Sequence, residues 1–213
     1  MRLESSEHLL DRSEQNALEV VDNIKSLLTP VIHYLAVKRS DQFPFVCYSA
    51  CDIIQNEIES NYHYKLKLCN GTRVDTTTKT ICRKHTWLEY GDLIIDPTDF
   101  QFNVISNNLP LTDENLVPKD ICLDGLSDEE LYNIFLQTYA ENRYKKYLSA
   151  PNEKEKRFQE LTILLQKGQI GPKVYSNILF AEYGSKVFYN KSDQESNIIY
   201  TADPRDAAEF YAS

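Results

Sequence analysis

The 213-residue sequence lacks a long hydrophobic run, and no apolar segment approaches the roughly 20 residues that a membrane-spanning helix needs. Its first eleven residues are charged and contain no apolar core of the kind found in secretory signals. These two absences predict a protein with no membrane span and no signal peptide, and they favour a cytoplasmic location.

The sequence also lacks an excess of positive charge, because 23 basic residues stand against 32 acidic ones and give a net charge of −9. Nucleic-acid binding depends largely on a basic patch, so nucleic acid is not an expected partner. The chain contains no GxSxG elbow, no phosphate loop of the GxxxxGK type and no dinucleotide glycine fingerprint. Serine hydrolases of the elbow type, P-loop NTPases and Rossmann enzymes are therefore not expected.

The five cysteines form no disulfide framework, since their number is odd and their spacing irregular. A reducing compartment with at least one free thiol fits this count. Zinc is the main alternative chemistry, with His63, Cys69, Cys82 and His85 as ligand types, but no CxxC or HxxxH pair is present. Cys82 and His85 also differ by an odd number, which on a regular strand places them on opposite faces. We expect no metal site and no cofactor.

Two helices are predicted in the first third of the chain. Apolar residues recur at helical spacing over 13–37, with Ser13 as the predicted N-cap and Pro30 predicted to kink or split the helix. A second helical pattern begins at Cys47 and continues to Ile58. This pattern places Cys47 at or near a helix N-terminus.

The next segment, 62–105, has the alternation of a small antiparallel sheet. Turns are predicted at Asn70-Gly71 and at Gly91-Asp92. The predicted strands cover 62–69, 76–81, 85–90 and 93–96.

The remaining chain, 106–213, has the pattern of a mostly helical extension. Ser127 and Glu130 form a predicted capping box at the start of a helix that continues to about Leu148. A second helix is predicted over 153–167, and a terminal one after Asp203-Pro204. We therefore predict an α+β fold with two units, a catalytic core over 1–105 and the extension over 106–213.

The predicted hairpin brings His85 and Asp96 close together. A four-residue loop would place them directly opposite each other, and a two-residue turn would make them diagonal neighbours on one face. The carboxylate would then orient the imidazole, as the third member of a catalytic triad does.

Cys47 is the predicted nucleophile, because a helix N-terminus favours a thiolate and its N–H groups can bind an oxyanion. Gln42 is a weaker prediction for a second oxyanion donor. Cys51, one helical turn later, is the alternative nucleophile.

This order of motifs resembles the transglutaminase-like branch of the papain-like cysteine enzymes. The resemblance covers 42–102 and depends on a cysteine opening a helix, the strand His85-Thr-Trp87, and Ile95-Asp-Pro-Thr98 followed by Gln101-Phe102. It implies a papain-like core with Cys47 as nucleophile, His85 as base and Asp96 as orienting residue, and Trp87 packed beside the site. Val46 departs from the small residue that often precedes the family's cysteine.

The resemblance further implies acyl transfer through a thioester, on a protein or peptide substrate that carries an amide. A glutamine deamidase or transglutaminase of the bacterial effector type is the first expectation, which would place the protein in a host cytosol. A thiol protease, an acyltransferase or a peptide cyclase of the same fold is the alternative. A binding module without catalysis, with the C-terminal helices docking a partner or covering the site, is the opposing interpretation.

Overall fold

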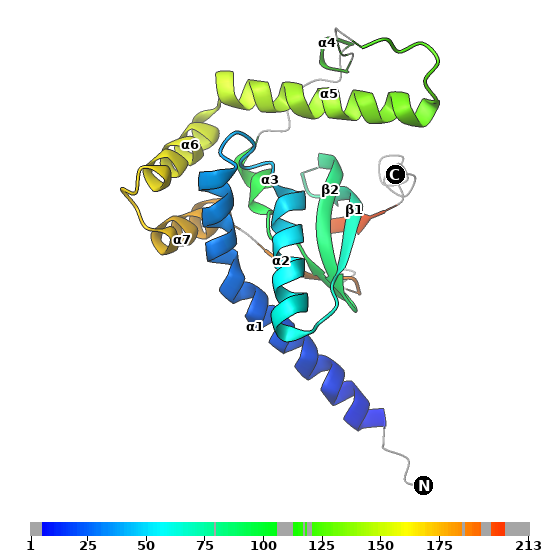
Figure 1. The fold of residues 1–213 in the computed structure, drawn as a ribbon, viewed down its shortest axis with the longest axis vertical. Helices are drawn as coiled ribbons and strands as arrows, with labels where there is room; N and C mark the ends of the chain where they lie inside the picture. The colour runs from blue at the N-terminus through cyan, green and yellow to red at the C-terminus, as the bar shows by residue number, and fades with distance from the viewer. Residues whose placement is uncertain are drawn as a thin grey trace.

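A computed structural model describes residues 6–78, 80–105, 113–116, 118, 121–184, 186–192 and 197–202. The chain has an α+β fold made of N-terminal helices, one antiparallel sheet and C-terminal helices (Figure 1). The α+β class predicted from the sequence is confirmed.

The N-terminal helices are α1 (Ser6–Lys38) and α2 (Cys47–Tyr62). The prediction that Ser13 caps the first helix was wrong, because 6–12 contains neither proline nor glycine and α1 continues upstream. Pro30 lies inside α1, on the exposed side of the helix. The helix continues through this proline and is not split there. Burial of the opposite, apolar side of α1 outweighs the local cost of a proline. That side carries Val20, Ile24, Leu28, Val31, Ile32 and Leu35.

Five strands form the sheet in the order β4-β3-β2-β1-β5. The strands are β1 (Lys67–Asp75), β2 (Thr80–Tyr90), β3 (Leu93–Ile95), β4 (Phe188–Asn190) and β5 (Ile198–Thr201). Both edge strands come from beyond residue 185, so the predicted C-terminal extension is not purely helical. It supplies two strands to the same sheet that carries His85.

The turn predicted at Asn70-Gly71 was wrong, because both residues lie inside β1. The chain instead turns at 76–78, between β1 and β2. A Cβ atom on Gly71 would collide with the carbonyl oxygen of Thr201 and would lie 2.8 Å from Cη2 of Trp87. Glycine at this position therefore allows β5 and an indole ring to approach the backbone closely. Glycine in a strand often marks such a close approach rather than a turn.

We expect Gly71→Ala to lower the free energy of unfolding by roughly 1–3 kcal/mol, the usual cost of overpacking a filled site. Urea unfolding followed by circular dichroism measures this change. Gly171→Ala is the matched control, since nothing lies within 4 Å of the added Cβ there. As Gly171 is an N-cap, its replacement should cost less than about 1 kcal/mol. Equal losses in the two variants would contradict the close-packing argument.

The C-terminal helices begin where the sequence predicts. In the capping box at the start of α5 (Asp128–Ser149), Ser127 Oγ accepts from the Glu130 N–H at 3.3 Å and the Glu130 carboxylate accepts from the Ser127 N–H at 2.8 Å. The predicted second helix is α6 (Glu153–Gln166), capped by Asn152. The other helices are α3 (Phe100–Val104), α4 (Asp113–Leu116) and α7 (Pro172–Tyr183). The terminal helix predicted after Asp203 lies outside the described residues.

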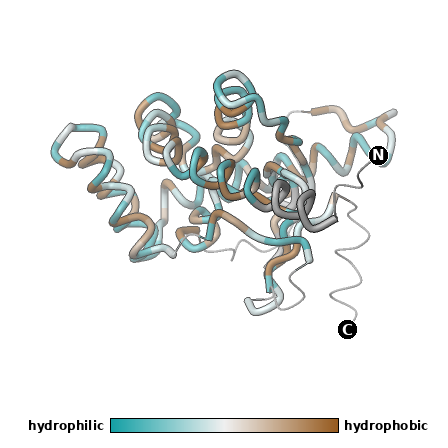
Figure 2. The backbone as a smooth tube through the Cα atoms, turned by 90° about the horizontal axis from the view of Figure 1, so that it is seen from below, coloured by the Kyte–Doolittle hydropathy of each residue, from teal (hydrophilic) through white to brown (hydrophobic). Residues whose placement is uncertain are grey.

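One apolar core joins the helices to the sheet. It is formed by α1, α2, α3, α6 and α7, by Tyr147 of α5 and by the sheet face that carries Leu88 and Ile95. Apolar and hydrophilic stretches alternate along the helical turns, as amphipathic helices require (Figure 2). The opposite sheet face carries a smaller aromatic cluster, which includes Trp87, Tyr189 and Tyr200. Within the described part of the chain, none of the helices combines the length and the hydropathy required to span a bilayer.

Candidate active site

Cys47 is the first residue of α2, as the helical pattern predicts. The residue before it, Val46, gives the helix no side-chain cap, and the first turn contains no acidic residue. The positive end of the helix dipole and its N–H groups are thus not neutralised by a neighbouring carboxylate of the same turn. Cys47 is half-buried rather than sealed in the core.

His85 lies on β2, in a hairpin whose two-residue turn is Gly91-Asp92. This turn makes His85 and Asp96 diagonal neighbours, which is the second of the two registers considered from the sequence. Asp96 directly follows β3, and its Oδ2 lies 2.6 Å from Nε2 of His85. Both side chains are buried, with 1% and 0% exposure.

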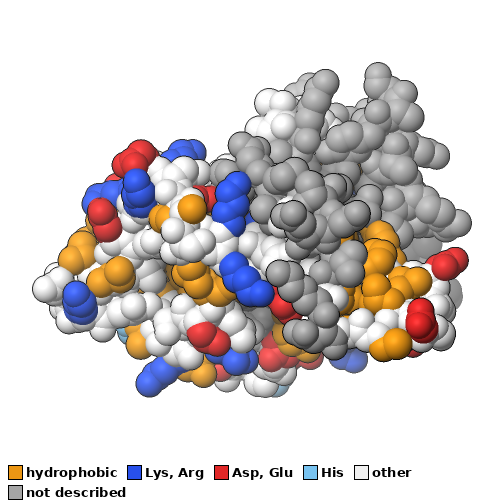
Figure 3. All heavy atoms as spheres, turned by 90° about the horizontal axis from the view of Figure 1, so that it is seen from above, with side chains coloured by type: hydrophobic (Ala, Val, Ile, Leu, Met, Phe, Trp, Pro, Cys, Tyr) orange, Lys and Arg blue, Asp and Glu red, His pale blue; other side chains and the backbone are white. Residues whose placement is uncertain are grey.

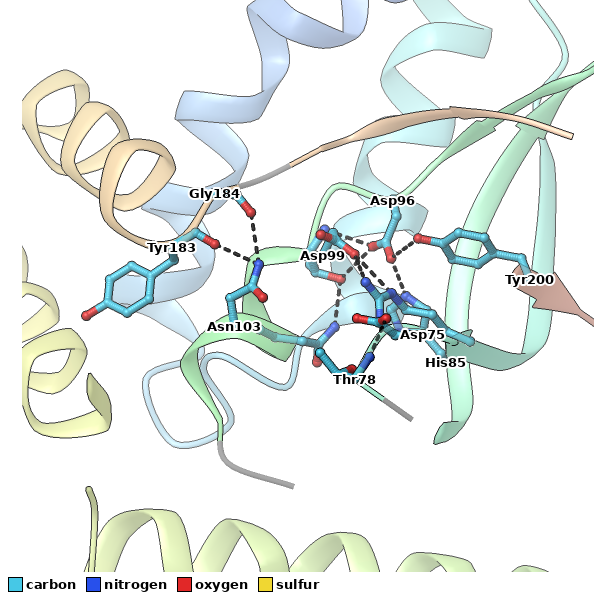
Figure 4. Close-up of polar contacts among 12 residues, drawn as sticks. Asp75, Thr78, His85, Asp96, Asp99, Asn103, Tyr183, Gly184 and Tyr200 are labelled. Carbon is cyan, nitrogen blue, oxygen red and sulfur yellow. Dashed lines mark hydrogen bonds and ion pairs between the residues drawn. The ribbon is translucent and has the colours of Figure 1, made fainter. Parts of the chain in front are cut away.

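The Asp96 carboxylate accepts four hydrogen bonds, two on each oxygen (Figure 4). Oδ2 accepts from His85 and from the Tyr200 hydroxyl at 2.9 Å. Oδ1 accepts from the Thr98 N–H at 3.1 Å and from its hydroxyl at 3.2 Å. A carboxylate with this many donors stays ionised even when buried.

The charges of the pair follow from these contacts. Burial alone disfavours the charged imidazole, but the charge of Asp96 and the hydrogen bonds to Asp96 and Cys47 raise the pKa of His85 well above its ordinary value. Burial also disfavours the Asp96 carboxylate, yet His85, Tyr200 and Thr98 together lower the pKa of Asp96. The pair is therefore imidazolium and carboxylate at neutral pH.

The Cys47 thiol and the His85 ring lie near enough for each to shift the pKa of the other. Because Nε2 of His85 is held by Asp96, the other ring nitrogen, Nδ1, is the one left for the thiol. Burial raises the pKa of Cys47, but the proximity and positive charge of His85, together with the Thr86 backbone, outweigh it, so the pKa is lowered. The structure thus brings the hydrogen-bonded His85–Asp96 pair and the Cys47 thiol together.

Cys51 lies one turn further along α2 and is fully buried. Its Sγ donates to the Thr86 carbonyl oxygen at 3.4 Å. Burial, together with the nearby charges of Asp96 and Cys47, raises the pKa of Cys51 well above its ordinary value. This thiol is a protonated donor inside the core, so the geometry favours Cys47 over Cys51.

The two supporting residues predicted from the sequence lie in different surroundings. Trp87 is 1% exposed, and its indole ring stacks beside His85 with centroids 6.4 Å apart. Gln42 lies in the turn before α2, where its side chain is exposed and its carbonyl oxygen accepts from the Phe45 N–H. The oxyanion role of Gln42 stays a prediction.

The sequence Asp96-Pro-Thr98 followed by Gln101-Phe102 has a physical explanation in the structure. Gln101 Nε2 donates to the Thr98 hydroxyl at 3.1 Å, so it orients the side chain that binds Asp96. Phe102 packs edge-on against the His85 ring, with centroids 4.9 Å apart. Each polar or aromatic member of this motif therefore either binds the carboxylate or fixes a group that does.

Below His85, a buried ion pair supports the site. Arg73 binds Oδ1 of Asp99 through Nη2 at 2.6 Å and Nε at 3.0 Å, and its guanidinium lies over the Phe102 ring at 4.1 Å. Burial of Arg73 opposes its charge, but Asp99 outweighs burial and raises the pKa of Arg73. Phe102 contacts both the Arg73 guanidinium and the His85 ring, so the ion pair is linked to the imidazole through Phe102.

A β-bulge corrects the parity argument that was used against zinc. The pairing between β1 and β2 shifts after Gly71, and Lys84 adopts a left-handed φ of 59°. Gly71 opposes His85 and Arg73 opposes Cys82, so Cys82 and His85 share a face although their numbers differ by three. Even so, no group of three or more His, Cys, Asp or Glu residues in the described ranges is placed to hold a metal ion.

Tyr200 is the member of the site that the sequence did not indicate. It lies on β5, 104 positions after Asp96, in the region predicted as a mostly helical extension. Burial and the nearby charge of Asp96 raise the pKa of Tyr200 well above its ordinary value, so the hydroxyl keeps its proton and remains a donor. The available signal was the run Ile198–Thr201, which is rich in the β-branched and aromatic residues that strands favour.

Comparison of the chain with protein-family models, with curated proteins and with solved structures gives no match. The functional argument therefore depends on the geometry of the site itself.

Proposed function

We propose that this protein is a cysteine-dependent acyl-transfer enzyme that acts on amide bonds, with Cys47 as nucleophile, His85 as general acid and base, and Asp96 as the residue that orients and stabilises the imidazolium. A glutamine deamidase or transglutaminase is the specific reaction proposed. The observation that carries the proposal is the buried His85 ring, which is hydrogen-bonded to the Asp96 carboxylate at 2.6 Å and lies near the Cys47 thiol, whose pKa it lowers.

The chemistry that this arrangement supports has two steps. The Cys47 thiolate attacks the carbonyl carbon, and the C–N bond breaks as His85 gives its proton to the departing amine, which leaves a thioester on the sulfur. His85 then removes a proton from water or from an amine, which attacks the thioester and releases the thiol. Water on a glutamine side chain gives glutamate and ammonia, whereas a primary amine gives a new amide.

The N-terminus of α2 supplies the hydrogen-bond donors that the reaction needs to stabilise an oxyanion. The carbonyl oxygen becomes an oxyanion when sulfur attacks, and N–H groups that point along the helix axis stabilise such a charge. No side chain caps this helix end, so its N–H groups are not occupied by a capping oxygen. The residues Cys47 and Tyr48 would present these donors from the same turn that holds the nucleophile.

The first experiment is alkylation of the folded protein with iodoacetamide from pH 4 to pH 9, a range of about five units that brackets perturbed and ordinary thiols. We expect Cys47 to react selectively, because the pKa of Cys47 is lowered and its reactive thiolate therefore persists at a lower pH than that of other cysteines. Mass spectrometry identifies the modified residue.

The variant His85→Ala tests the cause of this reactivity. It removes the hydrogen bond and the positive charge that lower the pKa of Cys47 and leaves burial, which raises it. The pH at which alkylation is half-maximal should therefore move upward. Uniform labelling of all five cysteines, or preferential labelling of Cys51, would favour the non-catalytic binding module instead.

A further inference from the structure

Arg143, on α5, is a buried arginine for which no carboxylate lies within ion-pair distance among the described residues. It is 8% exposed, and its Nε atom has no hydrogen-bond partner. Its guanidinium carbon lies 5.5 Å from the centroid of the Phe45 ring. The other buried arginine, Arg73, differs because it is paired with Asp99 at 2.6 Å. A buried guanidinium N–H without an acceptor costs free energy, which an anionic ligand would recover.

The position of Arg143 relates it to the candidate active site. Phe45, on which it rests, precedes Cys47 by only two residues. The charge of Arg143 also acts on Cys82, whose pKa is raised by burial and lowered in part by the charges of His85 and Arg143. A negative charge on Cys47 raises the pKa of the same Cys82 thiol. In Figure 1, α5 crosses the end of the molecule at which α2 begins.

Aromatic packing fixes the guanidinium in this place. Phe45 contacts Tyr144 and Tyr147 edge-on, with ring centroids 5.2 Å and 6.2 Å apart. These rings come from the same helix as Arg143, so α5 holds the arginine and its platform together. A fixed guanidinium plane offers two parallel N–H donors, the arrangement that a carboxylate accepts best.

We propose that Arg143 binds a carboxylate of the substrate beside the amide that Cys47 attacks, so that the preferred substrate is an amide flanked by an acidic group. This inference rests on the proposed function, because it takes Cys47 as the nucleophile. The net charge of −9 repels acidic substrates in general. Basic, acidic and apolar side chains are interspersed on the described surface seen from the α5 side (Figure 3). The attraction for a substrate carboxylate therefore comes from Arg143 itself and not from a broad basic surface.

The test compares two alkylating reagents that differ in charge, iodoacetate and iodoacetamide. Both react with the same Cys47 thiolate, so the ratio of their rate constants cancels any change in the pKa of Cys47. We expect Arg143→Gln to lower the iodoacetate-to-iodoacetamide ratio at Cys47 by about tenfold, because a focused positive charge raises the local concentration of an anion. Arg143→Lys, which keeps the charge, should retain most of the ratio.

The control variant is Arg157→Gln, which removes an exposed arginine of α6 that is paired with Glu182. Its ratio should equal that of the unmodified protein. An equal ratio for Arg143→Gln and the unmodified protein would overturn the inference. The ratio is defined even when Cys47 reacts no faster than the other thiols, so failure of the proposed nucleophile is seen separately, in the iodoacetamide rates alone.

A second measurement needs no variant and so does not depend on the folding of Arg143→Gln. N-acetylglutamic acid α-amide should slow iodoacetamide labelling of Cys47 more than N-acetylglutamine amide, which has the same shape without the charge. N-acetylglutamine with a free α-carboxylate separates the two sources of the anion, an acidic side chain and a chain terminus. No difference between either acid and the neutral diamide would contradict a carboxylate site.

Discussion

Replacement of Cys47 by alanine is expected to abolish amide turnover, with a loss on the order of 10⁶ in kcat, the size found when the nucleophile of a comparable triad is removed. The thioester cannot form without the sulfur, and water attacking directly lacks the covalent step that lowers the barrier. Two assays measure the loss: ammonia release from an N-blocked Gln-Gly peptide and incorporation of a fluorescent amine into casein. Circular dichroism should show a folded protein, since the Cys47 side chain is partly exposed.

The matched control for this prediction is Cys51→Ser in the same helix. The serine hydroxyl can donate to the Thr86 carbonyl as the Cys51 thiol does, so the core contact is kept. Turnover should stay within about threefold of the unmodified protein, since Cys51 is not part of the Cys47–His85–Asp96 chain. The opposite pattern, with Cys51→Ser inactive and Cys47→Ala active, would transfer the nucleophile to Cys51.

Local signals in the sequence were sufficient for the parts of the site that neighbours in the chain determine. The helical period set the start of α2 at Cys47, and Gly91-Asp92 set the hairpin that brings His85 to Asp96. The capping box at Ser127 likewise depends on residues within one turn. Each of these features involves contacts over at most 11 positions, for which a spacing argument is adequate.

Apart from the start of α1, the features that the sequence did not reveal depend on distant contacts. Gly71 has the sequence of a turn, but its role follows from the approach of β5, which is 130 positions away at Thr201. Tyr200 binds Asp96 only because β5 joins the edge of the sheet beside β1. The bulge at Lys84 depends on pairing with β1 and reverses a parity argument that holds for regular strands. No local propensity carries such information.

The C-terminal region is therefore part of the candidate site rather than an appendix to it. It contributes Tyr200 through β5 and Arg143 through α5, while α6 and α7 complete the core beneath α1. The first contact holds the Asp96 carboxylate, and the second brings a positive charge next to the turn that precedes Cys47. Removal of this region should therefore affect catalysis as well as stability.

The variant Asp96→Asn is expected to lower kcat by about 10²–10⁴, the upper end being the loss in a Ser-His-Asp site when the aspartate becomes an amide. The carboxylate accepts from donors on both sides, with His85 and Tyr200 on one oxygen and Thr98 on the other. An asparagine has one acceptor oxygen, so in either orientation its NH₂ group faces donors. With NH₂ toward His85, the imidazole must carry its proton on Nδ1 and cannot be an imidazolium paired with Cys47.

The loss of the imidazolium has a signature separate from activity. The charge of His85 lowers the pKa of Cys47, so in Asp96→Asn the iodoacetamide profile should move to higher pH. Asp99→Asn is the control, because it disturbs a neighbouring buried carboxylate that pairs with Arg73 and does not bind His85. It should lower stability by about 3–5 kcal/mol, the usual cost of breaking a buried pair, and leave the alkylation profile of Cys47 in place. An unshifted profile in Asp96→Asn would mean that the reactivity of Cys47 depends on the helix N-terminus alone, since both charges of the His85–Asp96 pair would then be dispensable.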